Sequence, residues 1–255
     1  MMLMRRLLLT SAVFLLLACS ALGYQSAQET KPDASRQSFH ITPLKPVDEL
    51  RRDALQAQPP AEPDKRKSDL VEVARLDRTI KLDIRYASDN NFMATPFYSQ
   101  ARAFLQRPAA QSLIAANREL RKHGYGILIH DAYRPWYVTK MFWDATPDDK
   151  KKFVANPAKG SMHNRGCAAD VSLYDMKTGK EVAMPSGYDE MSERAYPDYA
   201  GGTAGERTRR GLLREVMEMN KFTVYEFEWW HFDYENCTSW PIGNVPFEKL
   251  NSAGK

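Results

Sequence analysis

The apolar side chains between residues 68 and 250 follow two different periods. In residues 79–87 they alternate with polar side chains, which is typical of a half-buried strand. Residues 125–129 form a continuous apolar run that favours a central strand, and residues 168–174 and 222–234 are two further predicted strands. The period-two segments therefore predict a sheet.

Two segments have the helical period instead. Pro108 is expected to open a helix that ends just before Gly124, and residues 206–220 carry apolar side chains along one face. Residues 177–180 predict a turn into a short strand at 181–184. Helices among strands that are joined partly by hairpins indicate an α+β class, with a largely antiparallel sheet and flanking helices.

The first residues have the pattern of an export signal. Arg5 and Arg6 precede an apolar run of twelve residues, which is shorter than the roughly twenty that span a membrane. Residues 16–20 resemble the bacterial lipobox, so residues 1–18 are expected to be a lipoprotein signal peptide and Cys19 the lipidated amino terminus. The alternative is ordinary signal cleavage after Gly23. Because Ser20 is not aspartate, we expect a periplasmic protein anchored by lipid to the outer membrane.

A polar segment follows the signal. Residues 24–67 contain no glycine and hold six of the fifteen prolines. Such a segment buries little apolar surface, so residues 19–67 are predicted to be a flexible, Pro-rich tether, with at most a turn or two of helix near residues 48–56. The folded domain is then expected to cover residues 68–255.

The charge balance excludes one class of partner. Lysine and arginine outnumber aspartate and glutamate by 36 to 32, a formal charge of +4. Loss of Arg5 and Arg6 with the signal leaves about +2, far from the basic surplus that binding to a phosphate backbone favours. We therefore expect no nucleic-acid partner.

Of the five histidines, His163 and His231 are those with acidic residues nearby in a promising arrangement. Asp170 lies in an apolar strand, where an unpaired carboxylate is costly and a bound metal ion would offset that cost. The turn at Gly166 could bring Asp170 beside His163. Three-residue spacing places Glu228 and His231 on opposite faces of a regular strand, but a bulge or the end of the strand would bring them together.

Two imidazoles, one carboxylate and a water molecule complete a tetrahedral zinc site, and a further glutamate is left to act as a base. The spacing alone is equally consistent with a structural network of ion pairs.

The motifs resemble those of a known family. Ser-x-His-x-x-Gly-x-Ala-x-Asp at residues 161–170 and Glu-Trp-Trp-His at 228–231 are similar to the D-alanyl-D-alanine dipeptidases of vancomycin-resistance clusters and their bacterial relatives. These enzymes have the lysostaphin/D-Ala-D-Ala-peptidase/hedgehog-like zinc fold. Further similarity lies in residues 85–92, 131–135 and 188–189, so the resemblance covers about residues 70 to 240.

The resemblance implies one zinc ion per chain and a role for each matching residue. His163, Asp170 and His231 match the zinc ligands of the family. Glu228 matches the general base that takes a proton from the zinc-bound water.

The resemblance also implies that Arg134 stabilises the tetrahedral oxyanion, a charge that suits a planar guanidinium. The alternative for Arg134 is a structural salt bridge with Asp131. Asp131 is itself a candidate to orient Arg134.

Four residues match positions that would bind the substrate. Asp189 matches the carboxylate that pairs with the amino group of a dipeptide, with Tyr86 near it. Ser161 matches the residue that holds the dipeptide carboxylate, and Tyr98 is a candidate to assist it. Residues that bind both ends of the substrate would select peptides that are two residues long.

Three functions remain open on the sequence. The first is a zinc dipeptidase that cleaves D-Ala-D-Ala or a similar small cell-wall dipeptide. The second is a periplasmic DD- or LD-carboxypeptidase acting on peptidoglycan stem peptides. The third is a non-catalytic peptidoglycan-binding lipoprotein that keeps the fold. Cys167 and Cys237 are predicted to form a disulfide near the metal strands or to remain as two buried thiols.

Overall fold

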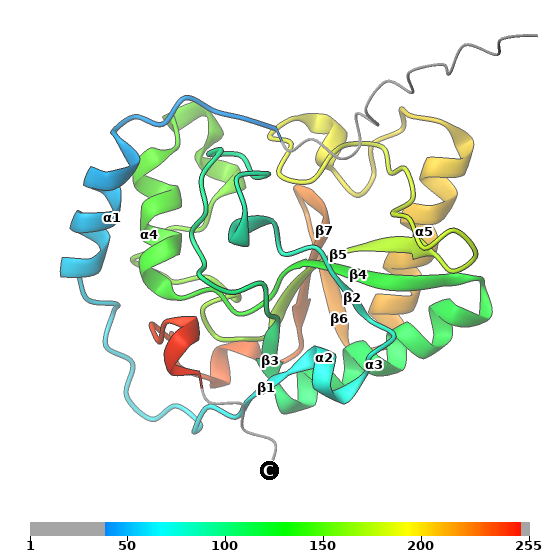
Figure 1. Cartoon of the computed structure of the whole chain (residues 1–255), viewed down its shortest axis with the longest axis horizontal. Coiled ribbons are helices and arrows are strands. Elements are labelled where there is room, and N and C mark those ends of the chain that lie inside the picture. Colours follow the sequence, from blue (N-terminus) through cyan, green and yellow to red (C-terminus); the bar gives the residue numbers. More distant parts are fainter. Residues whose placement is uncertain (1–38, 251–255) are drawn as a thin grey trace, which may run out of the picture. The chain divides into compact units, whose positions relative to one another are not determined.

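A five-stranded sheet lies at the centre of the computed structural model, which describes residues 39–250 (Figure 1). The order of its strands is β2-β4-β5-β7-β6, in which β2 and β4 are parallel and the other neighbours are antiparallel. A separate antiparallel pair is made by β1 and β3. The strands are β1 (Leu70–Glu72), β2 (Lys81–Leu82), β3 (Phe104–Gln106), β4 (Tyr125–Asp131), β5 (Ala168–Asp175), β6 (Phe222–Tyr225) and β7 (Glu228–Tyr234).

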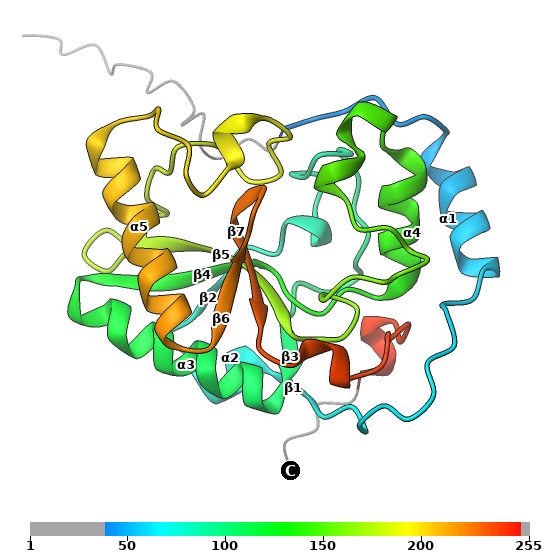
Figure 2. The ribbon, with the colours of Figure 1, turned by 180° about the vertical axis from the view of Figure 1, so that it is seen from behind.

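Helices flank this sheet. In the view from behind, α3 and α5 lie side by side and cover one face of it, while α1 packs against α4 elsewhere (Figure 2). The helices are α1 (Val47–Gln56), α2 (Val73–Leu76), α3 (Arg107–Lys122), α4 (Trp136–Ala145) and α5 (Ala204–Met219). Short 3-10 helices cover residues 85–87, 148–153, 193–195, 237–239 and 247–249. The expected α+β class with a largely antiparallel sheet is confirmed.

The two predicted long helices are confirmed, and local signals explain their ends. Pro108 is the second residue of α3, and Gly124 follows its end with φ +83°, a conformation that glycine adopts without strain. At α5, the Thr203 hydroxyl accepts a hydrogen bond from the Glu206 amide and the Glu206 carboxylate accepts one from the Thr203 amide. This capping box satisfies two amides that the helix leaves unpaired.

The predicted strands at 125–129 and 168–174 are confirmed as β4 and β5, but the one at 79–87 is mostly wrong. β2 holds only two residues, and the chain then turns into a 3-10 helix that buries both Arg85 and Tyr86. A regular strand directs neighbouring side chains to opposite faces, so burial of both is incompatible with the predicted alternation. Residues 181–184 form only an isolated bridge, between Glu181 and Tyr174.

The segment predicted as one last strand, residues 222–234, is a hairpin. It divides into β6 and β7, which pair antiparallel across a turn at Glu226 and Phe227. The sequence there lacks the Asn-Gly or Asp-Gly signal of a two-residue turn, so the pattern of apolar residues runs on without a visible break.

The expectation of an extended tether up to residue 67 differs from the structure over residues 39–67. These residues include α1, whose Leu50 and Ala54 are buried against the rest of the domain. With one buried leucine and one buried alanine, α1 has only a small apolar face, and this helix packs against α4. The expected signal peptide, Cys19 and the first part of the expected tether lie outside the described residues. Among residues 39–250, none of the helices has the length and hydropathy that crossing a membrane requires.

Candidate active site

Three adjacent strands place polar side chains in one row across the sheet. In the register, Asp170 of β5 lies opposite Asp131 of β4 on one side and opposite His231 of β7 on the other. Directly paired residues on neighbouring strands direct their side chains to the same face. A row of ionisable side chains therefore crosses the centre of the sheet.

A bulge in β4 determines which of its residues joins this row. Ile129 pairs with Val171, and two residues later Asp131 pairs with Asp170, so His130 is an extra residue on β4. Without the bulge, His130 would face Asp170. Instead its Nε2 lies 3.1 Å from a carboxylate oxygen of Glu181, away from the row. His130 is thus a packed, hydrogen-bonded residue outside the row.

A second irregularity brings Glu228 to His231. Between the pairs Tyr225–Glu228 and Val224–Phe232, β7 advances by four residues while β6 advances by one. The Oε2 atom of Glu228 consequently lies 3.8 Å from Nδ1 of His231. A bulge therefore brings Glu228 and His231 together, although three-residue spacing would place them on opposite faces of a regular strand.

His163 comes from the loop that leads into β5. The loop is wound into tight turns in which Gly166 donates its amide to the His163 carbonyl at 3.0 Å. Gly166 has φ +70°, and a Cβ atom there would lie 2.3 Å from the side chain of Leu70. Glycine therefore suits both the left-handed conformation and the close approach of the Leu70 side chain.

The side chains of His163, Asp170 and His231 converge on one point. His163 Nε2 lies 3.2 Å from Asp170 Oδ1 and 3.1 Å from His231 Nδ1, and the third separation, from His231 Nδ1 to Asp170 Oδ1, is 3.1 Å. A tetrahedral zinc site with bonds of about 2.0–2.1 Å has ligand atoms about 3.3 Å apart. Oδ1 of Asp170 is also buried without a hydrogen-bond partner. The donor set and its spacing fit a zinc ion.

The charges around this point favour a bound cation. Burial opposes ionisation of Asp170, but the two imidazoles hold the pKa of its carboxyl well below the ordinary value. Burial also opposes the charged form of His231, yet Asp233 and Asp170 raise its pKa well above the ordinary value. In the absence of metal a proton on His231 supplies the positive charge that these carboxylates require, and a metal ion would displace it.

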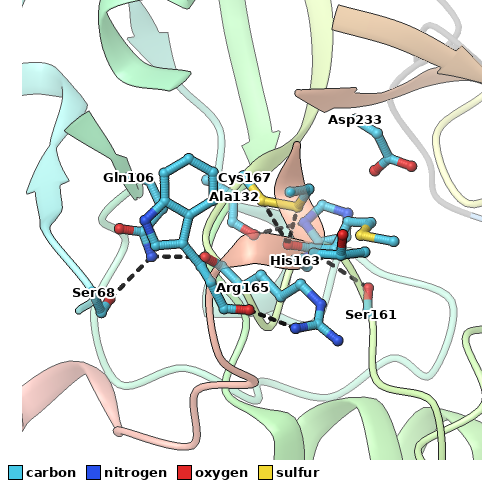
Figure 3. Close-up of a disulfide and its surroundings, with 12 residues drawn as sticks. Ser68, Gln106, Ala132, Ser161, His163, Arg165, Cys167 and Asp233 are labelled. Carbon is cyan, nitrogen blue, oxygen red and sulfur yellow. Dashed lines mark hydrogen bonds between the residues drawn. A yellow bond between two sulfur atoms is a disulfide. The ribbon is translucent and has the colours of Figure 1, made fainter. Parts of the chain in front are cut away.

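Each of the three groups is held by a further partner. Nδ1 of His163 donates to the Ala132 carbonyl at 2.6 Å, which leaves Nε2 free as a ligand (Figure 3). Nε2 of His231 lies 2.8 Å from an oxygen of Asp233. The Tyr188 hydroxyl donates to Asp170 Oδ2 at 2.8 Å.

Sequence reasoning missed Asp233 and Tyr188 as partners of the candidate ligands. The position of Asp233, two residues beyond His231 on the same strand face, was an available signal for the first.

Arg134 also faces this centre. Its Nε and Nη2 atoms lie 2.9 and 2.8 Å from Asp131 Oδ2, and Nη2 lies 3.7 Å from Asp170 Oδ2. The Tyr98 hydroxyl donates to the other oxygen of Asp131 at 2.8 Å. Asp131 therefore orients Arg134, and Tyr98 in turn orients Asp131. This differs from the expected contact between Tyr98 and a substrate, because the Tyr98 hydroxyl is directed at Asp131.

A cavity of about 210 Å³ lies at this centre. The His163, Asp170 and His231 side chains lie beside Glu228 and Arg134 in its lining. Apolar side chains complete its walls, among them Phe92, Phe142, Met162, Met191 and Trp230.

Two carboxyl groups in the cavity, those of Glu228 and Asp189, have strongly raised pKa values. Burial raises the pKa of Glu228 to about 8, with the neighbouring carboxylates adding to the effect and His231 opposing it. Burial likewise raises the pKa of Asp189 to about 7. Ionisable groups displaced this far from their ordinary values are concentrated at functional sites.

Three of the four expected substrate-binding residues line the cavity, and Tyr98 does not. Asp189 lies in the cavity lining with φ +59°; Tyr86, which also lines the cavity, donates its hydroxyl to Asp189 Oδ1 at 3.0 Å. The other oxygen of Asp189, Oδ2, is buried without a hydrogen-bond partner. Ser161 lines the cavity too, and its Oγ accepts from the His163 amide, so the hydroxyl hydrogen can be donated to a ligand.

Comparison with known proteins gives a consistent result. Residues 66–239 match the model of a family described as D-ala-D-ala dipeptidase, which is more than half of the chain. The protein belongs to this family of metallopeptidases.

Individual relatives agree with the family match. The chain is 31% identical over 187 residues to the D-alanyl-D-alanine dipeptidase of Escherichia coli, a match that covers 73% of this chain and 95% of that protein. It is 34% identical over 171 residues to the D-alanyl-D-alanine dipeptidase of Enterococcus faecalis, covering 60% of this chain and 85% of the relative.

Among solved structures, the LdcB LD-carboxypeptidase is 22% identical, with a TM-score of 0.36 over 55% of this chain and 60% of that chain. A likeness this low supports no inference about substrate.

Within this metallopeptidase domain, a disulfide joins the metal loop to the segment after β7. Cys167 and Cys237 are bonded, with their Cα atoms 5.8 Å apart (Figure 3). Of the two alternatives left open by the sequence, the structure has the disulfide. It ties the start of β5, three residues before Asp170, to the 3-10 helix that begins three residues after Tyr234.

Proposed function

We propose that the protein is a zinc-dependent dipeptidase that hydrolyses D-alanyl-D-alanine or a similar small cell-wall dipeptide. The observation that carries the proposal is the convergence of three ligand atoms on the cavity that Glu228, Arg134 and Asp189 also line. The relatives named D-alanyl-D-alanine dipeptidase support the choice of substrate.

In this proposal His163, Asp170 and His231 hold one zinc ion per chain. When bound, zinc lowers the pKa of a coordinated water molecule to about 7 and polarises a carbonyl group. The hydrogen bonds from the far nitrogens of the two imidazoles, to Ala132 and Asp233, keep the ligand nitrogens in their orientation.

Glu228 is the proton carrier. Its carboxylate lies beside His231 and borders the cavity, so it can accept a proton from the attacking water and return it to the departing amine. A nearby cation would favour the ionised form that a base needs, against the burial that raises its pKa in the metal-free protein.

Arg134 supports the developing negative charge on the substrate carbonyl oxygen. Its guanidinium is held by Asp131 and packs over the rings of Tyr86 and Phe142, so it is already in place before the substrate binds. Such preorganised donors stabilise a transition state without the cost of reorganisation.

The ends of the dipeptide are held by Asp189 and Ser161. The unpaired Oδ2 of Asp189 is suited to the ammonium group, and the Ser161 hydroxyl is suited to the carboxylate. Groups for both termini would limit the substrate to two residues.

We also propose that the protein is exported and anchored to the outer membrane through lipid on Cys19. The support is the sequence of residues 1–20 alone. Labelling with radioactive palmitate should mark the wild-type protein and not Cys19→Ser, and equal labelling of the two would refute this part of the proposal.

The substrate is tested with zinc-loaded, signal-free protein incubated with D-Ala-D-Ala, L-Ala-L-Ala and a pentapeptide muropeptide. The proposal expects free alanine from D-Ala-D-Ala and an unchanged muropeptide. Alanine released from the muropeptide would instead indicate a carboxypeptidase. Binding to sacculi without any released alanine would indicate a non-catalytic lipoprotein.

A further inference from the structure

Residues 39–65 precede the part of the chain that matches the family, yet they pack on the catalytic domain. The Ile41 amide donates to the carbonyl of Phe92, a residue of the cavity wall, at 2.9 Å. Farther along, Nζ of Lys65 donates to the Thr238 carbonyl at 2.9 Å. This N-terminal segment therefore contacts the domain at both of its ends.

Glu62 makes a buried contact between the segment and the domain. Its two carboxylate oxygens accept from Nη1 and Nη2 of Arg165 at 2.9 and 2.8 Å. Its Oε2 atom also accepts from the amide of Ile242 at 2.9 Å. Only 6% of the Arg165 side chain and 18% of the Glu62 side chain are exposed. Because the two groups form paired hydrogen bonds and are largely buried, their interaction is stronger than that of an ordinary exposed ion pair.

Arg165 belongs to the loop that carries His163. Its amide donates to the Met162 carbonyl at 3.1 Å, and its own carbonyl accepts from Nε2 of Gln106 at 2.8 Å (Figure 3). Its guanidinium also donates to the carbonyl of Trp240, three residues after the disulfide-bonded Cys237. The orientation of the His163 loop thus depends on a buried cation whose charge is neutralised from outside the family domain.

We propose that Glu62 is a positioning residue for the metal site, which holds the His163 loop in its ligating conformation through Arg165. The proposal rests on the proposed function only in taking His163 as a zinc ligand. Without the Glu62 carboxylate, Arg165 keeps a buried charge without its partner, and the loop can relieve that cost by moving its side chain toward water. His163 lies two residues away and would lose its alignment with Asp170 and His231.

The pKa of Glu62 is consistent with its pairing with Arg165. Burial opposes ionisation of Glu62, but the hydrogen bonds from Arg165 and the Ile242 amide, with Lys65 nearby, keep the pKa of its carboxyl below the ordinary value. The Glu62 carboxyl is therefore ionised throughout the neutral range.

The test measures zinc affinity by competition with a chromogenic chelator, which requires no substrate. Glu62→Gln removes the charge and keeps the shape of the side chain, and it should raise the zinc Kd about tenfold, the lower end of the effects seen for groups that orient metal ligands. Glu49→Gln is the matched control, since it makes the same replacement at an exposed ion pair with Lys45 in the same segment. It should leave the Kd within about twofold of the wild type.

A second control separates positioning from loss of stability. Leu50→Ala removes a buried side chain of α1, a helix that packs against α4, so it should lower the Tm of the metal-free protein without a comparable change in zinc Kd. Weakening of zinc binding by Leu50→Ala equal to that by Glu62→Gln would refute the positioning role.

Arg165→Lys provides an independent variant if Glu62→Gln does not fold. It keeps the charge but loses the paired hydrogen bonds, so zinc should again bind several-fold more weakly. Wild-type zinc affinity in either variant would overturn the proposal. Failure of the wild type to cleave D-Ala-D-Ala while these zinc affinities behave as expected would refute the proposed substrate and not the role of Glu62.

Discussion

At the scale of single residues, both candidate imidazole ligands are fixed by a hydrogen bond on the nitrogen that faces away from the metal point. His163 uses a backbone carbonyl, which has no charge, while His231 uses the carboxylate of Asp233. A carboxylate makes the imidazole a stronger donor toward a metal and fixes its tautomer. The two ligands should therefore respond differently to loss of their partners.

Replacement of Asp233 by asparagine tests this assignment. Asp233→Asn should weaken zinc binding by about 10- to 100-fold while the fold is retained, because the His231 ring loses its charged partner. Zinc titration against a chelator measures the Kd, and circular dichroism checks the fold. An unchanged Kd would show that Asp233 does not orient His231.

Asp189 carries the specificity for a free amino group in this account. Asp189→Asn should lower kcat/KM for D-Ala-D-Ala by about tenfold to a hundredfold, since a charged hydrogen bond contributes roughly 1.5–3 kcal/mol. The control is Asp198→Asn, the same replacement at an exposed carboxylate paired with Arg214. Equal kinetics of Asp189→Asn and wild type would remove Asp189 from substrate binding.

The candidate ligands could be chosen from the sequence because Asp170 is a charge in an apolar strand and His163 precedes a glycine turn. The sequence also named Asp131, as a candidate to orient Arg134, but the hydrophobic pattern does not show how Asp131 reaches the site. It joins the site because His130 is an extra residue in β4, and a bulge of this kind leaves no mark in that pattern. Tyr188 reaches Asp170 through a loop, whose path no periodicity predicts.

At the scale of elements, the hydrophobic pattern correctly predicted β4, β5, α3 and α5. It failed for segments whose conformation depends on contacts with distant parts of the chain. Residues 85–87 leave the strand because Arg85 is neutralised by Asp83 and Glu181, a partner nearly a hundred residues away. The helix α1 has too little apolar surface to be stable alone, and it forms because α4 covers Leu50. Neither partner is visible from the local sequence.

The pair β1–β3 is joined by an ion pair whose contribution depends on pH. Glu72 accepts from Arg102 at 3.0 and 2.8 Å and contacts Arg75 at 2.8 Å. The hydrogen bonds from Arg102 hold the pKa of Glu72 below the ordinary value, against the effect of burial.

A carboxyl whose pKa is lowered by folding stabilises the protein above the pKa of the unfolded chain, and that contribution disappears as the pH falls through the folded pKa. Glu72→Gln should therefore reduce the free energy of unfolding by about 1 kcal/mol at neutral pH and by nothing in acid below that pKa. Urea unfolding at both pH values measures the difference. An equal difference at both would contradict the ionic origin.

The disulfide should stabilise the domain through the length of the loop that it closes. Cys167 and Cys237 are separated by 70 residues, for which chain entropy gives about 4 kcal/mol. The double variant Cys167→Ala, Cys237→Ala should lose stability on this order in urea unfolding. Unfolding midpoints that do not differ between the variant and the oxidised wild type would show that the bond does not constrain the unfolded chain.

At the scale of the whole molecule, one row of ionisable side chains crosses the sheet, and segments from distant parts of the chain fix the side chains around it. The His163 loop is held by the disulfide, by Gln106 and by Glu62 of the N-terminal segment. The sheet supplies Asp170 and His231 in register. A rigid arrangement of this kind is what a site needs when its catalytic groups must be in place before the substrate arrives.

The most direct test of the account compares the rate of alanine release from D-Ala-D-Ala by wild-type and Glu228→Gln proteins that contain equal amounts of zinc. The account predicts one zinc per chain in both and a kcat at least about a thousandfold lower for Glu228→Gln, because the proton carrier is lost while the metal site is kept. Comparable rates at equal zinc content would contradict it.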